Sequence, residues 1–299
     1  MLTFLSRAAA RLTGAVEEAQ TLDAVAGPLA TAASTVIPRG PVNDLLSGTP
    51  AGHPLHPALV MVPLGSWLSA TTLDVLGGRE GRAAARRLLG VGSLAAVPAA
   101  LAGVNDWMDT RGPEQRVGLV HALLNVGGLG LFTASWWVRG RGHHGVGVAL
   151  SSTGMALAAA GGWLGGHLAY ARGVGVDTTV FQSAVQEWTD VGTEDLVRED
   201  MPILVRAHGI PVMLVRDGST IVALADRCTH RGAPLHEGTL DDGCVTCPWH
   251  GSRFRLADGA VMHGPATRPQ PRFEVRVHNG RLEVRQAGEL PSLRTNPVS

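Results

Sequence analysis

Four long apolar segments dominate the hydropathy pattern of the chain. They run from about residue 58 to 76, 88 to 104, 117 to 138 and 146 to 171. A helix rises about 1.5 Å per residue and a bilayer has a hydrocarbon core of about 30 Å, so each segment is long enough to cross it. Because the segments lack a polar face, membrane helices are favoured over buried helices of a soluble bundle. We therefore expect a four-helix transmembrane domain over residues 53–172.

The chain on either side of this domain is more polar. Residues 1–52 contain an amphipathic stretch from about residue 2 to 22, which we interpret as a candidate interfacial helix without the features of a cleaved signal peptide. Residues 173–189 are expected to form a linker. Residues 190–288 alternate as strands do, with hairpin turns at Asp217-Gly218 and Asn279-Gly280. Residues 289–299 are expected to be a disordered tail. The predicted fold is multi-domain, a four-helix transmembrane bundle followed by an all-β domain.

Composition adds three observations to this picture. The chain has 25 basic and 25 acidic residues and a formal net charge of +0, so no nucleic-acid-binding surface is predicted. All the basic residues are arginine, and the abundance of alanine and glycine indicates a GC-rich bacterial gene. A mean hydropathy of +0.13 favours a protein with membrane segments. The lipid bilayer is therefore the first expected partner.

Two short stretches of the β region each carry one cysteine and one histidine. The pattern is Cys228-x-His230 and, after sixteen intervening residues, Cys247-x-x-His250. Zinc also binds two cysteines and two histidines, but zinc fingers use a pair of cysteines and a pair of histidines, not one of each per loop. A 2Fe–2S cluster with two thiolates on one iron and two imidazoles on the other fits the pattern better.

The residues around this motif, 229–235 and 247–254, resemble the two cluster loops of Rieske proteins. The resemblance implies a small β-sandwich and a Rieske 2Fe–2S cluster that transfers single electrons. It also implies that Cys228 and Cys247 bind one iron and that His230 and His250 bind the other. Rieske clusters have potentials from about −150 to +300 mV, because neutral imidazoles replace two anionic sulfurs.

Four further positions refine the resemblance. Ala233 and Trp249 stand where respiratory Rieske proteins have a disulfide, so the domain resembles the ferredoxin type. Ser252 matches a serine that hydrogen-bonds a bridging sulfide, whereas Phe254 replaces a tyrosine that donates to a cysteine sulfur. Hydrogen bonds to sulfur favour the reduced cluster, so with one donor kept and one lost we expect an intermediate potential.

Three histidines, His56, His121 and His167, lie near one end of the predicted bundle. Ionisable residues inside a membrane are costly and usually functional. The three histidines could ligate haem b, in which case His121 would pair with His56 or His167. They could instead bind a separate metal, hydrogen-bond a quinone, or only cap helices. The sequence around them, over about residues 50–176, resembles an uncharacterised family of four-span bacterial membrane domains. That resemblance implies a fold and topology but no activity.

These features predict a multi-pass bacterial membrane protein that passes single electrons at the membrane surface to an unidentified redox protein or a quinone. Two alternatives stay open: a quinol- or haem-linked membrane oxidoreductase that uses the bundle histidines, and a non-enzymatic redox sensor. A Rieske oxygenase needs a further domain with mononuclear iron, and only about fifty residues follow His250. Arginines flank both ends of the apolar segments, so the positive-inside rule leaves the side of the membrane that carries the β domain undecided. Whether the protein is itself an enzyme is also undecided.

Overall fold

The computed structural model describes residues 2–199 and 201–287, and it divides the chain into two compact units. One unit contains residues 1–38 and 54–175, and the other contains residues 39–53 and 176–299. The expected tail, 289–299, lies outside the described residues.

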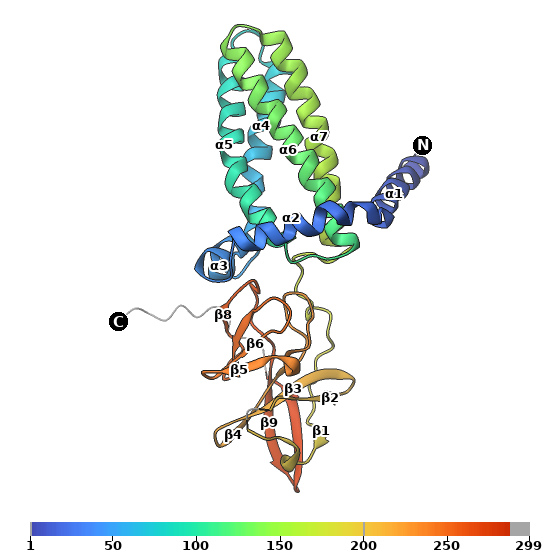
Figure 1. Cartoon of the computed structure of the whole chain (residues 1–299), viewed down its shortest axis with the longest axis vertical. Helices are drawn as coiled ribbons and strands as arrows, with labels where there is room; N and C mark the ends of the chain where they lie inside the picture. The colour runs from blue at the N-terminus through green and yellow to red at the C-terminus, as the bar shows by residue number, and fades with distance from the viewer. Residues whose placement is uncertain (1, 200, 288–299) are drawn as a thin grey trace, which may run out of the picture. The chain divides into compact units, whose positions relative to one another are not determined.

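Four long helices form an up-and-down bundle in the first unit (Figure 1). They are α4 (Leu55–Leu76), α5 (Gly81–Trp107), α6 (Pro113–Gly140) and α7 (His144–Tyr170). All four are long and apolar enough to cross a membrane. Large apolar side chains cover the outside of the bundle, for example Val75 and Leu94, which are each 76% exposed. An apolar outer surface of this kind suits lipid, so the expected four-helix domain is confirmed as a fold.

Arginine and glycine–proline features mark the ends of the bundle helices. Arg86, in the first turns of α5, donates from Nε to the carbonyl oxygen of Trp136 at 3.1 Å and lies over the indole ring, 5.1 Å from its centroid. At the start of α6, Gly112 has a φ of +56° and Pro113 opens the helix. This glycine–proline turn reverses the chain between α5 and α6.

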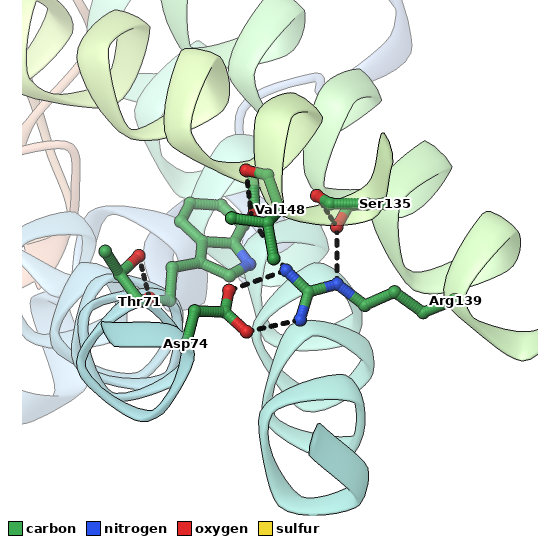
Figure 2. A network of polar contacts seen from close by, with 8 residues as sticks. Thr71, Asp74, Ser135, Arg139 and Val148 are labelled. Carbon is green, nitrogen blue, oxygen red and sulfur yellow. Dashed lines mark hydrogen bonds and ion pairs between the residues drawn. The ribbon is translucent and has the colours of Figure 1, made fainter. Parts of the chain in front are cut away.

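A buried ion pair joins α4 to α6 at the opposite end of the bundle (Figure 2). Both guanidinium Nη atoms of Arg139 donate to the carboxylate of Asp74 at 2.6 Å, and the two side chains are 2% and 4% exposed. Arg139 also donates to the hydroxyls of Ser135 at 3.0 Å and Ser151 at 2.9 Å. Each charge therefore has hydrogen-bonding partners, as a buried ion pair requires.

Two helices before the bundle pack against its other end. α1 (Leu2–Glu18) and α2 (Asp23–Val36) are joined by the short η1 (Gln20–Leu22), and α2 crosses the bundle where α6 begins (Figure 1). Arg116 of α6 donates to the carboxylate of Asp23 at 3.0 Å. Glu17 accepts from His167 at 2.6 Å and from Arg172 at 2.7 Å. These contacts hold the α1–α2 segment on the bundle, while its position at a membrane interface stays a prediction.

The contact of Glu17 is expected to weaken in acid. Hydrogen bonds from Arg172 and then His167 lower the pKa of the Glu17 carboxyl. Because its pKa is lower in the folded state, ionised Glu17 stabilises that state. This contribution is complete above the ordinary carboxyl pKa of about 4.3 and is lost as the pH falls through the pKa of the folded state. Hydrogen exchange of the α1 amides, corrected for intrinsic rate, should therefore accelerate below about pH 4. In Glu17→Gln the α1 amides should exchange faster at neutral pH, and their exchange should show no further acceleration in acid. The same acceleration in this variant would contradict its assignment to Glu17.

The second unit contains two antiparallel sheets. Their strands are β1 (Thr189–Gly192), β2 (Ile203–Ala207), β3 (Ile210–Asp217), β4 (Thr220–Ala225), β5 (Thr239–Asp241), β6 (Cys244–Thr246), β7 (Arg253–Arg255), β8 (Val261–His263), β9 (Arg272–His278) and β10 (Arg281–Gln286). The larger sheet has the order β1-β10-β9-β4-β3-β2, and the smaller has the order β5-β6-β7-β8. The hairpins β3–β4 and β9–β10 have the expected turns.

Alternation along the strands builds two cores. On β3, Met213 and Val215 contribute to the core that contains Val245 and Phe254 of the smaller sheet, whereas Val212 and Leu214 contribute to the core on the other face. Successive strand residues point to opposite faces, so the larger sheet is covered on both sides. The predicted all-β sandwich is confirmed.

Residues 39–53 pack with the β unit, which differs from the boundary that we expected near residue 52. This segment forms α3 (Pro41–Ser47) and the short η2 (Thr49–Ala51). Asp44 accepts from the Gly264 backbone N–H at 2.8 Å and from His263 at 3.1 Å, and the Thr49 hydroxyl donates to the carbonyl of Ala266 at 2.9 Å. The end of the expected linker differs too, because residue 185 is buried in the β core. Neither contact is visible in local sequence patterns.

Candidate iron–sulfur centre

The four residues of the Cys-His motif lie in two loops beside the smaller sheet. The first loop joins β4 to β5 and carries Cys228 and His230, and the second joins β6 to β7 and carries Cys247 and His250. The first loop passes through η4 (Leu235–Glu237). Both cysteines and His250 are buried. Strand pairing therefore brings together four side chains that come from distant positions in the chain.

The two cysteine sulfurs are neighbours and lie among backbone donors. Backbone N–H groups of residues 230 and 231 donate to Cys228, and those of residues 249 and 250 donate to Cys247. The hydrogen bond that Cys228 donates lowers the pKa of the Cys247 thiol to about 7, and the same bond, with burial, raises the pKa of Cys228. Backbone donors around buried sulfur suit thiolate ligands.

The two imidazoles form the other half of the centre. The ring centroids of His230 and His250 are 5.0 Å apart, and the ring planes are nearly perpendicular at 89°. The Nδ1 atom of each ring is buried and makes no hydrogen bond within the described chain, although both residues take part in other interactions. Two thiols and two imidazole nitrogens converging from two loops fit a 2Fe–2S cluster with mixed ligands.

Gln270 holds the first cluster loop in place. Its side chain is fully buried, and its amide nitrogen donates to the carbonyl oxygens of Ala225 and Arg227 at 2.5 and 2.6 Å. Its amide oxygen accepts from the backbone N–H of Thr229 at 3.2 Å. Thr178 adds a hydrogen bond from its hydroxyl to the carbonyl of Cys228 at 2.7 Å. The loop is therefore fixed on both sides of the first cysteine.

Ser252 and the 39–53 segment complete the surroundings of the second loop. The Ser252 hydroxyl oxygen is buried and accepts from the Ala266 N–H at 3.0 Å, which leaves its own O–H available for donation. Asp44 and Thr49 hold residues 264–266 from the other side. The positive charge of Arg39 acts on Cys247 through space. Segment 39–53 thus contributes both support and charge to the centre.

The bundle histidines separate into two groups. The ring centroids of His56 and His121 are 6.4 Å apart. His167 instead donates to Glu17, as described above. The structure therefore brings together two of the three histidines that the sequence singled out, because α1 contributes a carboxylate to the third.

Sequence reasoning missed the residues that position the loops. Gln270, Thr178 and Asp226 belong to this group; Asp226 accepts from the His236 ring at 2.9 Å and from its backbone N–H at 2.8 Å. Gln270 follows a proline in a stretch without alternation, where a buried polar residue has no local signature. Only the Asp226-x-Cys228 spacing, which places an acidic residue two positions before the motif, could have drawn attention to one of them.

Two protein families match separate parts of the chain. The Rieske [2Fe-2S] domain family matches residues 187–278, and the family described as predicted membrane protein (DUF2231) matches residues 52–178. The anthranilate 1,2-dioxygenase ferredoxin subunit of Burkholderia cepacia is 34% identical over 103 residues, which are 34% of this chain and 95% of that protein. Ferredoxin CarAc of Metapseudomonas resinovorans is 42% identical over 84 residues, or 28% of this chain and 77% of that protein.

A solved structure is also similar to part of the chain. The ferredoxin of carbazole 1,9a-dioxygenase from Nocardioides aromaticivorans IC177 is 28% identical, with 34% of this chain and 100% of that chain covered and a TM-score of 0.32. The family matches imply a Rieske 2Fe–2S cluster in the β unit. The chain therefore belongs to the Rieske [2Fe-2S] family and joins a Rieske domain to a domain of the DUF2231 membrane-protein family.

Proposed function

We propose that this protein is a membrane-anchored one-electron carrier in which Cys228 and Cys247 bind one iron and His230 and His250 bind the other. The observation that carries the proposal is the convergence of two buried thiols and two buried imidazole Nδ1 atoms from the two loops. When bound, the cluster supplies a reversible one-electron couple. Relatives such as the anthranilate 1,2-dioxygenase ferredoxin subunit and ferredoxin CarAc are ferredoxins, which supports an electron-transfer role.

The residues of the chain determine how such a cluster would work. Backbone N–H groups around the sulfurs stabilise negative charge, which increases on reduction. Gln270 and Thr178 fix the first loop, so little reorganisation accompanies electron transfer. Trp249 is 55% exposed beside His250, and its ring centroid lies 6.3 Å from that of His250. We propose that a redox partner, a protein or a quinone, approaches the centre at this exposed aromatic side chain.

Membrane anchoring is the second part of the proposal. Four apolar helices and the match to a predicted membrane-protein family support a multi-pass bacterial membrane protein. Fractionation of cells that express the full chain tests this part. We expect the protein to stay in the membrane pellet after alkaline carbonate and high salt, and to be released by detergent. Release by carbonate alone would contradict an integral membrane location.

Electron transfer is tested directly on detergent-purified protein. Chemically reduced protein should show the paramagnetic resonance signal of a reduced Rieske cluster and lose it on addition of a one-electron acceptor, such as cytochrome c or a soluble quinone. A cluster that cannot be reoxidised by any of these acceptors would contradict a carrier role. A structural change on reduction, with no electron transfer to acceptors, would instead favour the redox sensor.

Ser252→Ala is expected to lower the reduction potential by about 50–100 mV. The hydroxyl would donate to a bridging sulfide, and losing a hydrogen bond of about 1.5–2 kcal/mol destabilises the more negative reduced cluster, with about 59 mV per 1.4 kcal/mol. Protein-film voltammetry measures the shift, and iron content confirms that the cluster is retained. Ser219→Ala, on the exposed β3–β4 turn, is the matched control. An unchanged potential in Ser252→Ala would exclude the hydroxyl as a donor to the cluster.

A further inference from the structure

Helices α4 and α6 carry the same series of side chains at the same spacing. A histidine is followed after eleven residues by a buried aromatic side chain and after eighteen residues by a charged one. The series are His56, Trp67 and Asp74 in α4, and His121, Phe132 and Arg139 in α6. The two aromatic rings stack with centroids 4.1 Å apart, the charged pair has a 2.6 Å contact, and the imidazole centroids are 6.4 Å apart. Equivalent positions of the two helices therefore face each other.

Helices α5 and α7 repeat in the same way. His56 contacts the carbonyl oxygen of Ala99 in α5 through Nδ1 at 2.8 Å, and His121 contacts that of Gly161 in α7 through Nδ1 at 2.7 Å. A glycine follows each of these residues after four positions: Gly103 follows Ala99, and Gly165 follows Gly161. A Cβ at Gly103 would lie only 2.8 Å from Cε1 of His56, and a Cβ at Gly165 only 3.1 Å from Cε1 of His121. The hairpins α4–α5 and α6–α7 are therefore two copies of one unit, related by an approximate two-fold axis along the bundle.

The hydrogen bonds decide which nitrogen of each ring is available. A carbonyl oxygen can only accept, so Nδ1 of both His56 and His121 carries a proton, and in the neutral ring Nε2 then keeps a lone pair. A histidine that ligates a metal commonly donates its other ring N–H to a backbone carbonyl in this way. The Asn125 amide nitrogen lies 3.4 Å from both nitrogens of the His121 ring, so it covers the ring face rather than bonding one nitrogen.

The arrangement discriminates between the classes of ligand. A bare metal ion in a protein usually takes three or more side-chain ligands, whereas the contact described here joins two imidazoles, those of His56 and His121. A quinone carbonyl needs an N–H donor, but Nε2 here is an acceptor. Haem supplies four nitrogens to its iron and needs only two axial ligands. Two imidazoles on one metal, with bonds of about 2 Å, have centroids roughly 6 Å apart.

We propose that His56 and His121 bind one haem b on the two-fold axis, each through Nε2. The observed separation of 6.4 Å and the angle of 80° between the ring planes fit axial ligands rather than stacked rings. Gly103 and Gly165 let both rings lie against the helix backbone, because a side chain at either glycine would collide with the Cε1 edge of the ring. The site lies within the bundle, so it is independent of the cluster and goes beyond the proposed carrier function.

The experiment is a haem assay on full-length protein expressed with a haem precursor and purified in detergent. We expect about one haem per chain and the narrow reduced bands of bis-imidazole haem beside the broad Rieske absorption. His56→Gly and His121→Gly should each lose haem yet keep the resonance signal of the cluster. His167→Ala is the matched control, because its ring binds Glu17, and it should keep the haem. Purified protein that contains haem but no iron–sulfur cluster would refute the proposed carrier function and leave the haem proposal standing.

Rescue separates loss of a ligand from loss of the fold. Exogenous imidazole should restore haem and its bands in His56→Gly and His121→Gly, which requires an intact bundle. Gly103→Leu, which leaves both ligands in place but crowds the His56 ring, should reduce haem content. Folded wild-type protein that takes up no haem, or a double His56→Gly, His121→Gly variant that retains it, would overturn the proposal. A metal bound without haem in the bundle of the wild-type protein, and absent from His121→Gly, would also overturn the proposal.

Discussion

Cys247→Ser is expected to leave the protein without its iron–sulfur cluster. Cys247 is buried in the second loop and accepts hydrogen bonds from two backbone N–H groups as well as from Cys228. Serine provides an oxygen that is far more basic and binds iron less well than a thiolate, so one iron loses half of its protein sulfur ligands. Iron and acid-labile sulfide should fall from about two of each per chain to near zero, and the resonance signal of the reduced cluster should vanish.

Cys244→Ser is the matched control for this experiment. Cys244 is the third cysteine of the chain; it is free, buried in β6 and three residues before Cys247. Because its side chain is in neither of the proposed ligand pairs, the variant should keep full iron and sulfide. The helix signal in circular dichroism should be unchanged in both variants, since the bundle does not contain the cluster residues. Loss of the cluster in Cys244→Ser but not in Cys247→Ser would contradict the ligand assignment.

Asp74→Ala is expected to destabilise the bundle by about 3–5 kcal/mol, because it leaves the Arg139 guanidinium buried without its counter-charge. The side chain of Arg139 is 2% exposed, and Gly147 packs directly against it, so it cannot reach solvent without moving helices. Ser135 and Ser151 remain as hydrogen-bond acceptors but carry no negative charge. Denaturant unfolding in mixed micelles, followed through the helix signal, measures the change.

A double variant and an exposed ion pair serve as controls for this prediction. Replacing both partners, as in Asp74→Leu with Arg139→Met, should cost less than Asp74→Ala, because no unpaired charge is then buried. Asp190 and Arg281 form an ion pair of 2.8 Å whose side chains are 46% and 50% exposed. Asp190→Ala should change the stability of its own unit far less than Asp74→Ala changes that of the bundle, because solvent screens the exposed pair. Equal losses in Asp190→Ala and Asp74→Ala would contradict the importance of burial.

The sequence by itself determined the features that depend on neighbouring residues. Segment length and apolarity predicted four membrane-type helices, because each helix satisfies its own backbone hydrogen bonds. Alternation and turn residues predicted the hairpins of the β unit, because residues two apart share a face of a strand. The motif Cys228-x-His230 and Cys247-x-x-His250 predicted the centre, because a loop that ligates metal needs its ligands within a few residues of each other.

Only the tertiary structure decided the features that depend on distant residues. His121 pairs with His56 rather than with His167, because Glu17 of α1, 150 residues before His167, takes the third imidazole. The segment 39–53 joins the β unit through Asp44 and its contacts more than two hundred residues away. Gln270 supports a loop some forty residues earlier in the chain. A hydrogen bond between distant residues depends on how helices and sheets pack, and the spacing along the chain contains no record of that packing.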